Sequence, residues 1–64
     1  MSIETMENII SYVDLYFCDK HTTPSVNEIA LGVGIPKTTA FRYLVEMDSR
    51  GMIEYDGRSR TIHT

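Results

Sequence analysis

The sequence has few of the residues that build covalent cross-links, metal clusters and membrane anchors. A single cysteine, Cys18, excludes a disulfide within the chain and a cysteine cluster for a metal. We expect it to pack as a small, at least half-buried apolar side chain. No apolar run approaches the roughly 20 residues that a membrane-spanning helix needs. Residues 2–7 carry two acids and no base, the wrong charge for a secretion signal, so we expect a cytoplasmic protein without membrane, metal or cofactor.

The chain is also too short for a second domain or a deep catalytic cleft. Its 64 residues suffice for one domain over residues 1–64, and chains of this size bury only about 60% of their unfolded surface. Hydrophobic residues make up 42% of the chain and charged residues 23%, which is ordinary for a folded domain. No nucleophile lies at an activating spacing from a base. We therefore expect a binding domain and not an enzyme.

Basic residues are few, but they are concentrated. The formal net charge is −3. Residues 1–36 hold one base and five acids, a balance of −4, whereas residues 37–64 hold five bases and four acids, a balance of +1. Because five of the six bases lie in the second part, the acidic sum does not exclude a local anion-binding face there.

Apolar spacing predicts a first helix over residues 2–20. Ser2 suits the N-cap, and the helix must end before Pro24, since the residue preceding a proline avoids the helical region. Apolar side chains recur at steps of three and four, which predicts one buried stripe made of Met6, Ile9, Ile10, Val13, Tyr16 and Phe17.

A short second helix is predicted to open at Ser25. Ser25 and Glu28 have the S-x-x-E spacing of a capping box. We expect this helix to end at Gly32, because Gly32 and Gly34 both tolerate the positive φ of a sharp turn.

A third helix is predicted over residues 36–50. Pro36 suits its first turn and Gly51 stops it. Its buried stripe is expected to comprise Ala40, Tyr43, Leu44 and Met47.

The rest of the chain alternates between apolar and polar residues, which is typical of strands. Residues 52–55 and 60–63 are strand-like, with Asp56 and Gly57 as a turn signal between them. The expected fold class is therefore mainly α with a small β-hairpin: three helices followed by a two-stranded ribbon.

A short helix, a glycine turn and a longer helix predict a helix-turn-helix, and a following hairpin makes it winged. The stretches that resemble bacterial winged-helix repressors are Asn27-Glu28-Ile29-Ala30, Val33-Gly34-Ile35, Thr39-Ala40-Phe41-Arg42-Tyr43-Leu44 and Arg50-Gly51-Met52-Ile53-Glu54. Together with Thr23-Pro24-Ser25-Val26 before the first stretch, they look most like the DNA-binding domain of LexA-type repressors. The resemblance covers roughly residues 6–62 and implies that the third helix reads DNA.

An α-helix fits the major groove, and the side chains that read bases must face away from the core near its N-terminus. The candidates there are Lys37, Thr38, Thr39, Phe41 and Arg42. Arg42 suits a guanine edge or a phosphate, the alternative being a solvated pair with Glu46 four residues on. The resemblance implies DNA contacts at Thr39, Phe41 and Arg42.

Two further segments are candidates for phosphate contacts. Ser25 and Asn27 lie where the second helix begins, and helix N-termini offer free N–H groups to anions. Arg58, Ser59 and Arg60 lie in the predicted wing of residues 52–63, where they would reach a phosphate or the minor groove. The alternative for these arginines is protection of an edge strand.

These features predict a sequence-specific, double-stranded DNA-binding transcription regulator, acting as a repressor by occlusion. So small a module makes few contacts, so we expect a homodimer or tethering to a separate dimerisation domain. One alternative is a protein-binding winged helix, suggested by the acidic first helix and by apolar Phe41 and Val45 on the reading face. Another is an architectural DNA-binding factor of a mobile element, which would use the same fold.

Overall fold

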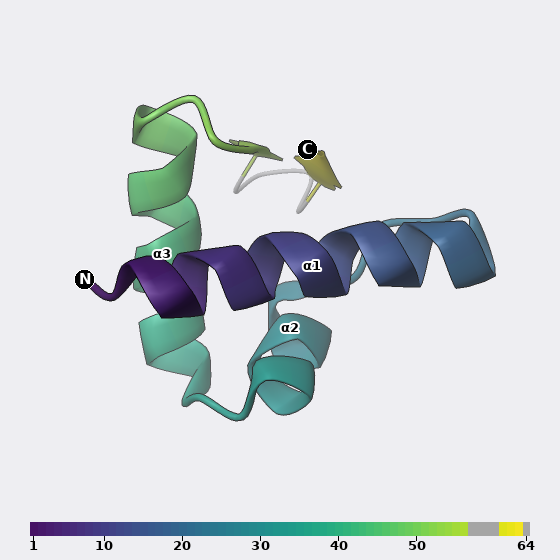
Figure 1. Cartoon of the computed structure of the whole chain (residues 1–64), viewed down its shortest axis with the longest axis horizontal. Helices are drawn as coiled ribbons and strands as arrows, with labels where there is room; N and C mark the ends of the chain where they lie inside the picture. The colour runs from purple at the N-terminus through teal and green to yellow at the C-terminus, as the bar shows by residue number, and fades with distance from the viewer. Residues whose placement is uncertain (57–60, 64) are drawn as a thin grey trace.

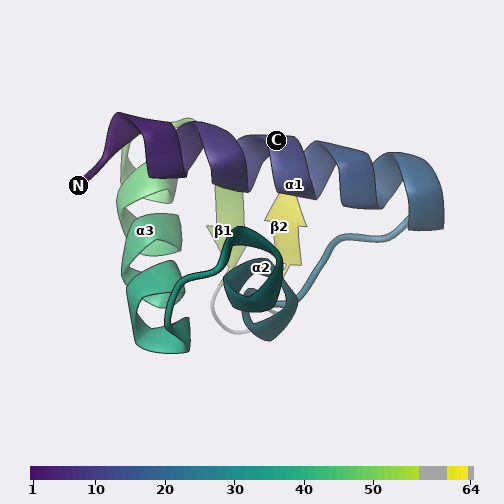
Figure 2. The same ribbon diagram turned by 60° about the horizontal axis from the view of Figure 1, so that its bottom comes forward.

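The computed structural model describes residues 1–56 and 61–63, with side chains for residues 1–55. Three helices and two short strands follow one another in this part: α1 (Ile3–Lys20), α2 (Val26–Val33), α3 (Lys37–Ser49), β1 (Glu54–Asp56) and β2 (Thr61–His63). Helix α1 crosses both α2 and α3. In Figure 1 the strands lie on one side of α1 and α2 lies on the other, and in Figure 2 the strands lie behind α2. The predominantly helical character predicted from the sequence is confirmed.

Helix α1 begins and ends at the predicted residues. The Ser2 hydroxyl accepts a hydrogen bond from the Thr5 amide at 3.3 Å, which is the expected N-cap. At the other end His21 takes a left-handed conformation (φ 58°), and its N–H donates to the carbonyl of Phe17. The chain therefore leaves the helix two residues before the Thr23-Pro24 step, as the proline requires.

The predicted stripe of α1 is only partly buried. Met6, Ile9 and Val13 are buried, but Phe17 is 51% exposed, and Cys18 is also exposed. Both predictions were wrong, for different reasons. Phe17 is exposed because the last turn of α1 extends beyond the other helices and strands, as Figures 1 and 2 show, so no element covers it. Cys18 is exposed because it lies on the outward face of α1, three residues after the exposed Leu15.

Helix α2 carries the predicted capping box. The Ser25 hydroxyl accepts from the Glu28 amide at 3.2 Å, and a Glu28 carboxylate oxygen accepts from the Ser25 amide at 3.4 Å. The predicted end at Gly32 was wrong by one residue. The helix continues to Val33, and Gly34 alone supplies the positive φ of the turn (81°).

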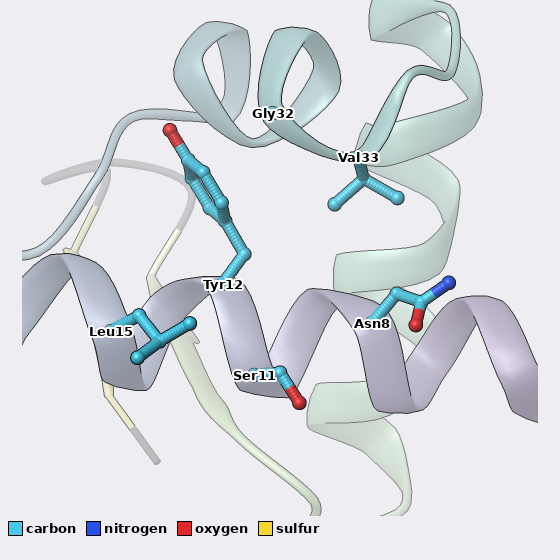
Figure 3. A pocket seen from close by; sticks show the side chains of 6 residues that line it. All are labelled: Asn8, Ser11, Tyr12, Leu15, Gly32 and Val33. Carbon is cyan, nitrogen blue, oxygen red and sulfur yellow. The ribbon is translucent and has the colours of Figure 1, made fainter.

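Gly32 instead allows α1 to approach α2 closely. The ring of Tyr12 on α1 lies against Gly32, and a Cβ at this position would overlap the ring. Figure 3 shows the Tyr12 side chain rising from α1 toward α2 beside Gly32. The missing side chain is therefore a packing requirement.

Replacing Gly32 with alanine is expected to destabilise the domain. Inside a helix this change normally gains about 1 kcal/mol, but here the new methyl group must displace the Tyr12 ring. Thermal unfolding of a double-mutant cycle measures the balance: in a Tyr12→Ala background, Gly32→Ala should become neutral or stabilising. An equal effect in both backgrounds would contradict the close approach.

Helix α3 lies between a proline and a glycine. Pro36 was predicted to be the first residue of the helix, but it occupies the N-cap in an extended conformation, and the helix begins at Lys37. The Pro36 carbonyl accepts a hydrogen bond from the Ala40 amide. At the other end Gly51 takes φ 74°, its N–H donating to the Asp48 carbonyl and the Met52 N–H to the Met47 carbonyl. These two bonds form a Schellman motif, so the predicted glycine stop is confirmed.

All three helices and the segment after α3 contribute to one apolar core. The side chains predicted for the buried stripe of α3 are all buried, and α2 and the segment before β1 complete the set: Met6, Ile9, Val13, Val26, Ile29, Ala30, Ala40, Tyr43, Leu44, Met47 and Ile53. The Ser2 amide also donates to the Tyr43 hydroxyl at 2.9 Å, which ties the start of α1 to α3. The core therefore fixes the face that α3 turns outward.

The strands are shorter than predicted. β1 and β2 pair antiparallel, with Tyr55 opposite Ile62 and Asp56 opposite Thr61. Asp56 is therefore a strand residue and not part of a two-residue turn; residues 57–60, which link the strands, lie outside the described part. Ile53 was expected in the strand but precedes it, and its side chain is buried in the core.

Candidate nucleic-acid interface

The outward face of α3 carries most of the residues proposed from the sequence. Thr38, Arg42 and Val45 follow one another at steps of four and three, opposite the buried stripe, and all are exposed. Lys37 is exposed in the first turn, whereas Thr39 is half-buried and lies nearer the core. The helix therefore presents a ridge of side chains beginning at its N-terminal end.

Arg42 is available for an external partner. The sequence left open a pair between Arg42 and Glu46, but the Glu46 carboxylate instead accepts from the Arg50 guanidinium at 2.9 Å. Among the side chains described, Arg42 has neither an ion pair nor a hydrogen bond. Its guanidinium thus keeps all its donors for a base edge or a phosphate.

Phe41 packs partly against β1. Its ring meets the Tyr55 ring edge-on, with centroids 5.8 Å apart and planes at 88°. The Tyr55 amide also donates to a carboxylate oxygen of Asp48 at 3.1 Å. The sequence did not predict this pairing of Phe41 with Tyr55. Phe41 remains 47% exposed, so part of its ring still belongs to the outward face.

The start of α2 offers fewer donors than the sequence suggested. The Ser25 hydroxyl both accepts from the Glu28 amide and donates to the Glu28 carboxylate, so it is already satisfied. Within the described residues, the amides of Val26 and Asn27 have no partner, and Asn27 is exposed. A phosphate would meet these two amides and the Asn27 side chain, with the Glu28 carboxylate nearby.

The Glu28 carboxylate interacts electrostatically with Tyr16 of α1. Hydrogen bonding from the Tyr16 hydroxyl, together with the Ser25 donors, lowers the pKa of Glu28. The same bond, followed by desolvation and the negative charge of Glu28, raises the pKa of Tyr16. The pair links the cap of α2 to α1 when Tyr16 is neutral and Glu28 is charged.

This pair predicts how stability depends on pH. A lowered glutamate pKa contributes stability above its unfolded value of 4.5, lost as pH falls through the folded pKa. A raised tyrosine pKa contributes stability below 10.0, lost as pH rises through the folded pKa. Thermal unfolding as a function of pH should show that Tyr16→Phe loses less stability than the parent at both the acidic and the alkaline end of the range. Identical pH profiles would refute the bond.

Other predicted elements add nothing to the site in the described part. Arg58, Ser59 and Arg60 lie outside the described residues. Within residues 1–56 and 61–63, no cluster of histidine, cysteine or acidic side chains could hold a metal, and no helix is long and apolar enough to cross a membrane.

Comparison with known proteins identifies the family. The profile of the IclR helix-turn-helix domain matches residues 16–57, from the later turns of α1 to just beyond β1. No curated protein and no solved structure matches the chain. This match does not support the narrower LexA-type resemblance, which depended on residues 23–30 and 50–54. The chain belongs to the IclR helix-turn-helix family and is a DNA-binding domain of the kind found in transcription regulators.

Proposed function

We propose that the chain binds a specific double-stranded DNA sequence and represses transcription by occupying it. The observation that carries the proposal is the outward face of α3, where Arg42 is exposed and unpaired among the described side chains, with Lys37 and Thr38 preceding it. This face would enter the major groove, where Arg42 would bind a guanine edge and Thr38 a thymine methyl or a phosphate. Thr39 and Phe41 would contact the groove from the two flanks of the ridge.

Phosphate contacts would hold this orientation. Asn27 would bind the backbone through its amide and side chain, with Ser25 shaping the turn by its capping bonds. The paired strands would serve as a wing, with Arg58, Ser59 and Arg60 reaching a phosphate or the minor groove.

Two copies would act together. A single module of this size covers few base pairs, and specific interfaces generally need more surface. We propose that pairing arises by self-association or through a domain attached to this chain, in the cytoplasm, at two half-sites related by a two-fold axis.

Selection of bound sequences from a random duplex pool tests the proposal. A palindromic enriched motif, bound less tightly as salt rises, would support specific recognition by two copies. Salt-sensitive binding without an enriched motif would indicate an architectural DNA-binding factor instead. No binding to any duplex at low salt would favour the protein-binding alternative, for which exposed Val45 and Phe41 would be the contact residues.

A further inference from the structure

A groove of about 290 Å³ lies between α1 and α2, apart from the residues assigned to DNA. Figure 3 shows it from close by: Tyr12 and Val33 stand on either side, and Leu15, Ser11 and Asn8 follow along α1. Its lining consists of Asn8, Ser11, Tyr12, Leu15, Gly32 and Val33, none of them charged. The hollow is thus mostly apolar, with two small polar side chains at one end.

The walls of the groove belong to the packing of α1 against α2. The Tyr12 ring lies against Gly32, and Val33 packs on the core. Leu15, by contrast, is 70% exposed although it lines the hollow. An apolar side chain held at the rim of a preformed groove is an anchor point for a partner.

Acids surround the groove along α1. Glu4 lies four residues before Asn8 and Asp19 four residues after Leu15, so both continue the lining face at its two ends. Glu7 lies on the adjacent stripe, and all three acids are exposed. The one base of α1, Lys20, points instead over the Tyr16 ring, 5.6 Å from its centroid. An uncharged hollow is thereby framed by negative charge.

We propose that this groove docks an amphipathic helix of a partner protein, with apolar side chains in the hollow and lysine or arginine residues flanking them. Helix-in-groove recognition uses anchors spaced by three and four residues, and Leu15 with Tyr12 provides the matching surface. The acids would select a basic segment and speed its approach. A second copy of this chain is disfavoured as the occupant, because a symmetric contact would set these acids against each other.

Synthetic peptides provide the test on the whole 64-residue chain. The probe is a helical peptide with leucines at steps of three and four and lysines elsewhere. One comparison peptide has glutamate in place of lysine, and the other has the lysine peptide's composition with its leucines dispersed. Anisotropy of the labelled probe should show saturable binding that is at least about tenfold tighter than for either comparison. Amide shifts in NMR should centre on Ser11, Leu15 and Val33.

Two matched substitutions locate the contact. Leu15→Ser should weaken probe binding about tenfold, since a buried leucine side chain contributes about 1.5 kcal/mol or more. Ile3→Ser alters another exposed aliphatic residue of α1, which lies outside the groove, and should change the affinity less than about twofold. Circular dichroism checks that both variants fold, and both should bind duplex DNA as the parent does.

Three results would overturn the proposal. One is that the dispersed-leucine peptide binds as tightly as the probe, which would mean that binding depends on charge alone. Another is an unchanged affinity in Leu15→Ser. The third is concentration-dependent self-association that shifts the groove amides without peptide, since the occupant would then be a second copy. DNA binding is measured separately in each variant, so failure here is distinguishable from failure of the proposed DNA recognition.

Discussion

Replacing Arg42 with alanine is expected to weaken binding to the selected duplex by about 1–3 kcal/mol, or about 5- to 150-fold. The guanidinium is exposed on the outward face of α3 and has no partner among the described side chains that could compensate for its loss. If it binds a guanine bidentately, removing it should also relax the sequence preference at one base pair. Fluorescence anisotropy with the selected duplex and single-base variants, at fixed salt, measures both effects.

Two further variants sharpen that result. Arg50→Ala removes an arginine near the other end of the same helix that is already paired with Glu46, so its effect should be much smaller. Arg42→Lys keeps the charge but not the planar fork. If Arg42→Lys retains the parental affinity, Arg42 contacts a phosphate. If Arg42→Lys loses as much affinity as Arg42→Ala, Arg42 contacts a base. Parental affinity in Arg42→Ala would show that this face of α3 does not read DNA.

Replacing Leu44 with alanine is expected to remove a large share of the protein's free energy of unfolding. Leu44 is fully buried in the centre of the core, and truncating such a side chain costs about 2–5 kcal/mol. A chain of 64 residues has a total stability of only about 3–10 kcal/mol by the usual per-residue scale. Thermal and urea unfolding followed by circular dichroism measure the loss.

Val45→Ala is the matched control for that substitution. Val45 is the next residue of α3, but its side chain is 48% exposed on the outward face. Its truncation should change the free energy of unfolding by about 0.5 kcal/mol or less. Similar losses at both positions would mean that α3 is rotated from the orientation described, and the assignment of Arg42 to the outward face would fail with it.

Three helix boundaries, at Ser2, Ser25 and Gly51, could be predicted because each depends on neighbours in the sequence. A serine cap needs only its own hydroxyl and an amide three residues on, as at Ser2 and Ser25. A glycine stop needs only a residue that tolerates positive φ, as at Gly51. The buried stripe of α3 could be predicted too, since its spacing fixes one face wherever the partner helices lie.

The errors concern distances in space that the sequence does not encode locally. Gly32 has the signature of a helix end, but its role is set by Tyr12, twenty residues earlier. Periodicity identified the apolar face of α1 but not how far the neighbouring elements extend along it, and so Phe17 was misplaced. The Arg42–Glu46 alternative failed because Glu46 has a second arginine within reach at the same spacing, on its other side.

The contact between α3 and β1 bears on the thermodynamics of recognition. The Phe41–Tyr55 ring pair and the bond from the Tyr55 amide to Asp48 connect the outward side of α3 to the first strand at two points. Helix and strand are therefore held at a fixed mutual angle before any ligand arrives. The conformational entropy of bringing them together is lost during folding and not again on association, which leaves more of the contact energy for affinity. Loosening this joint would thus lower affinity without removing a single contact to the ligand.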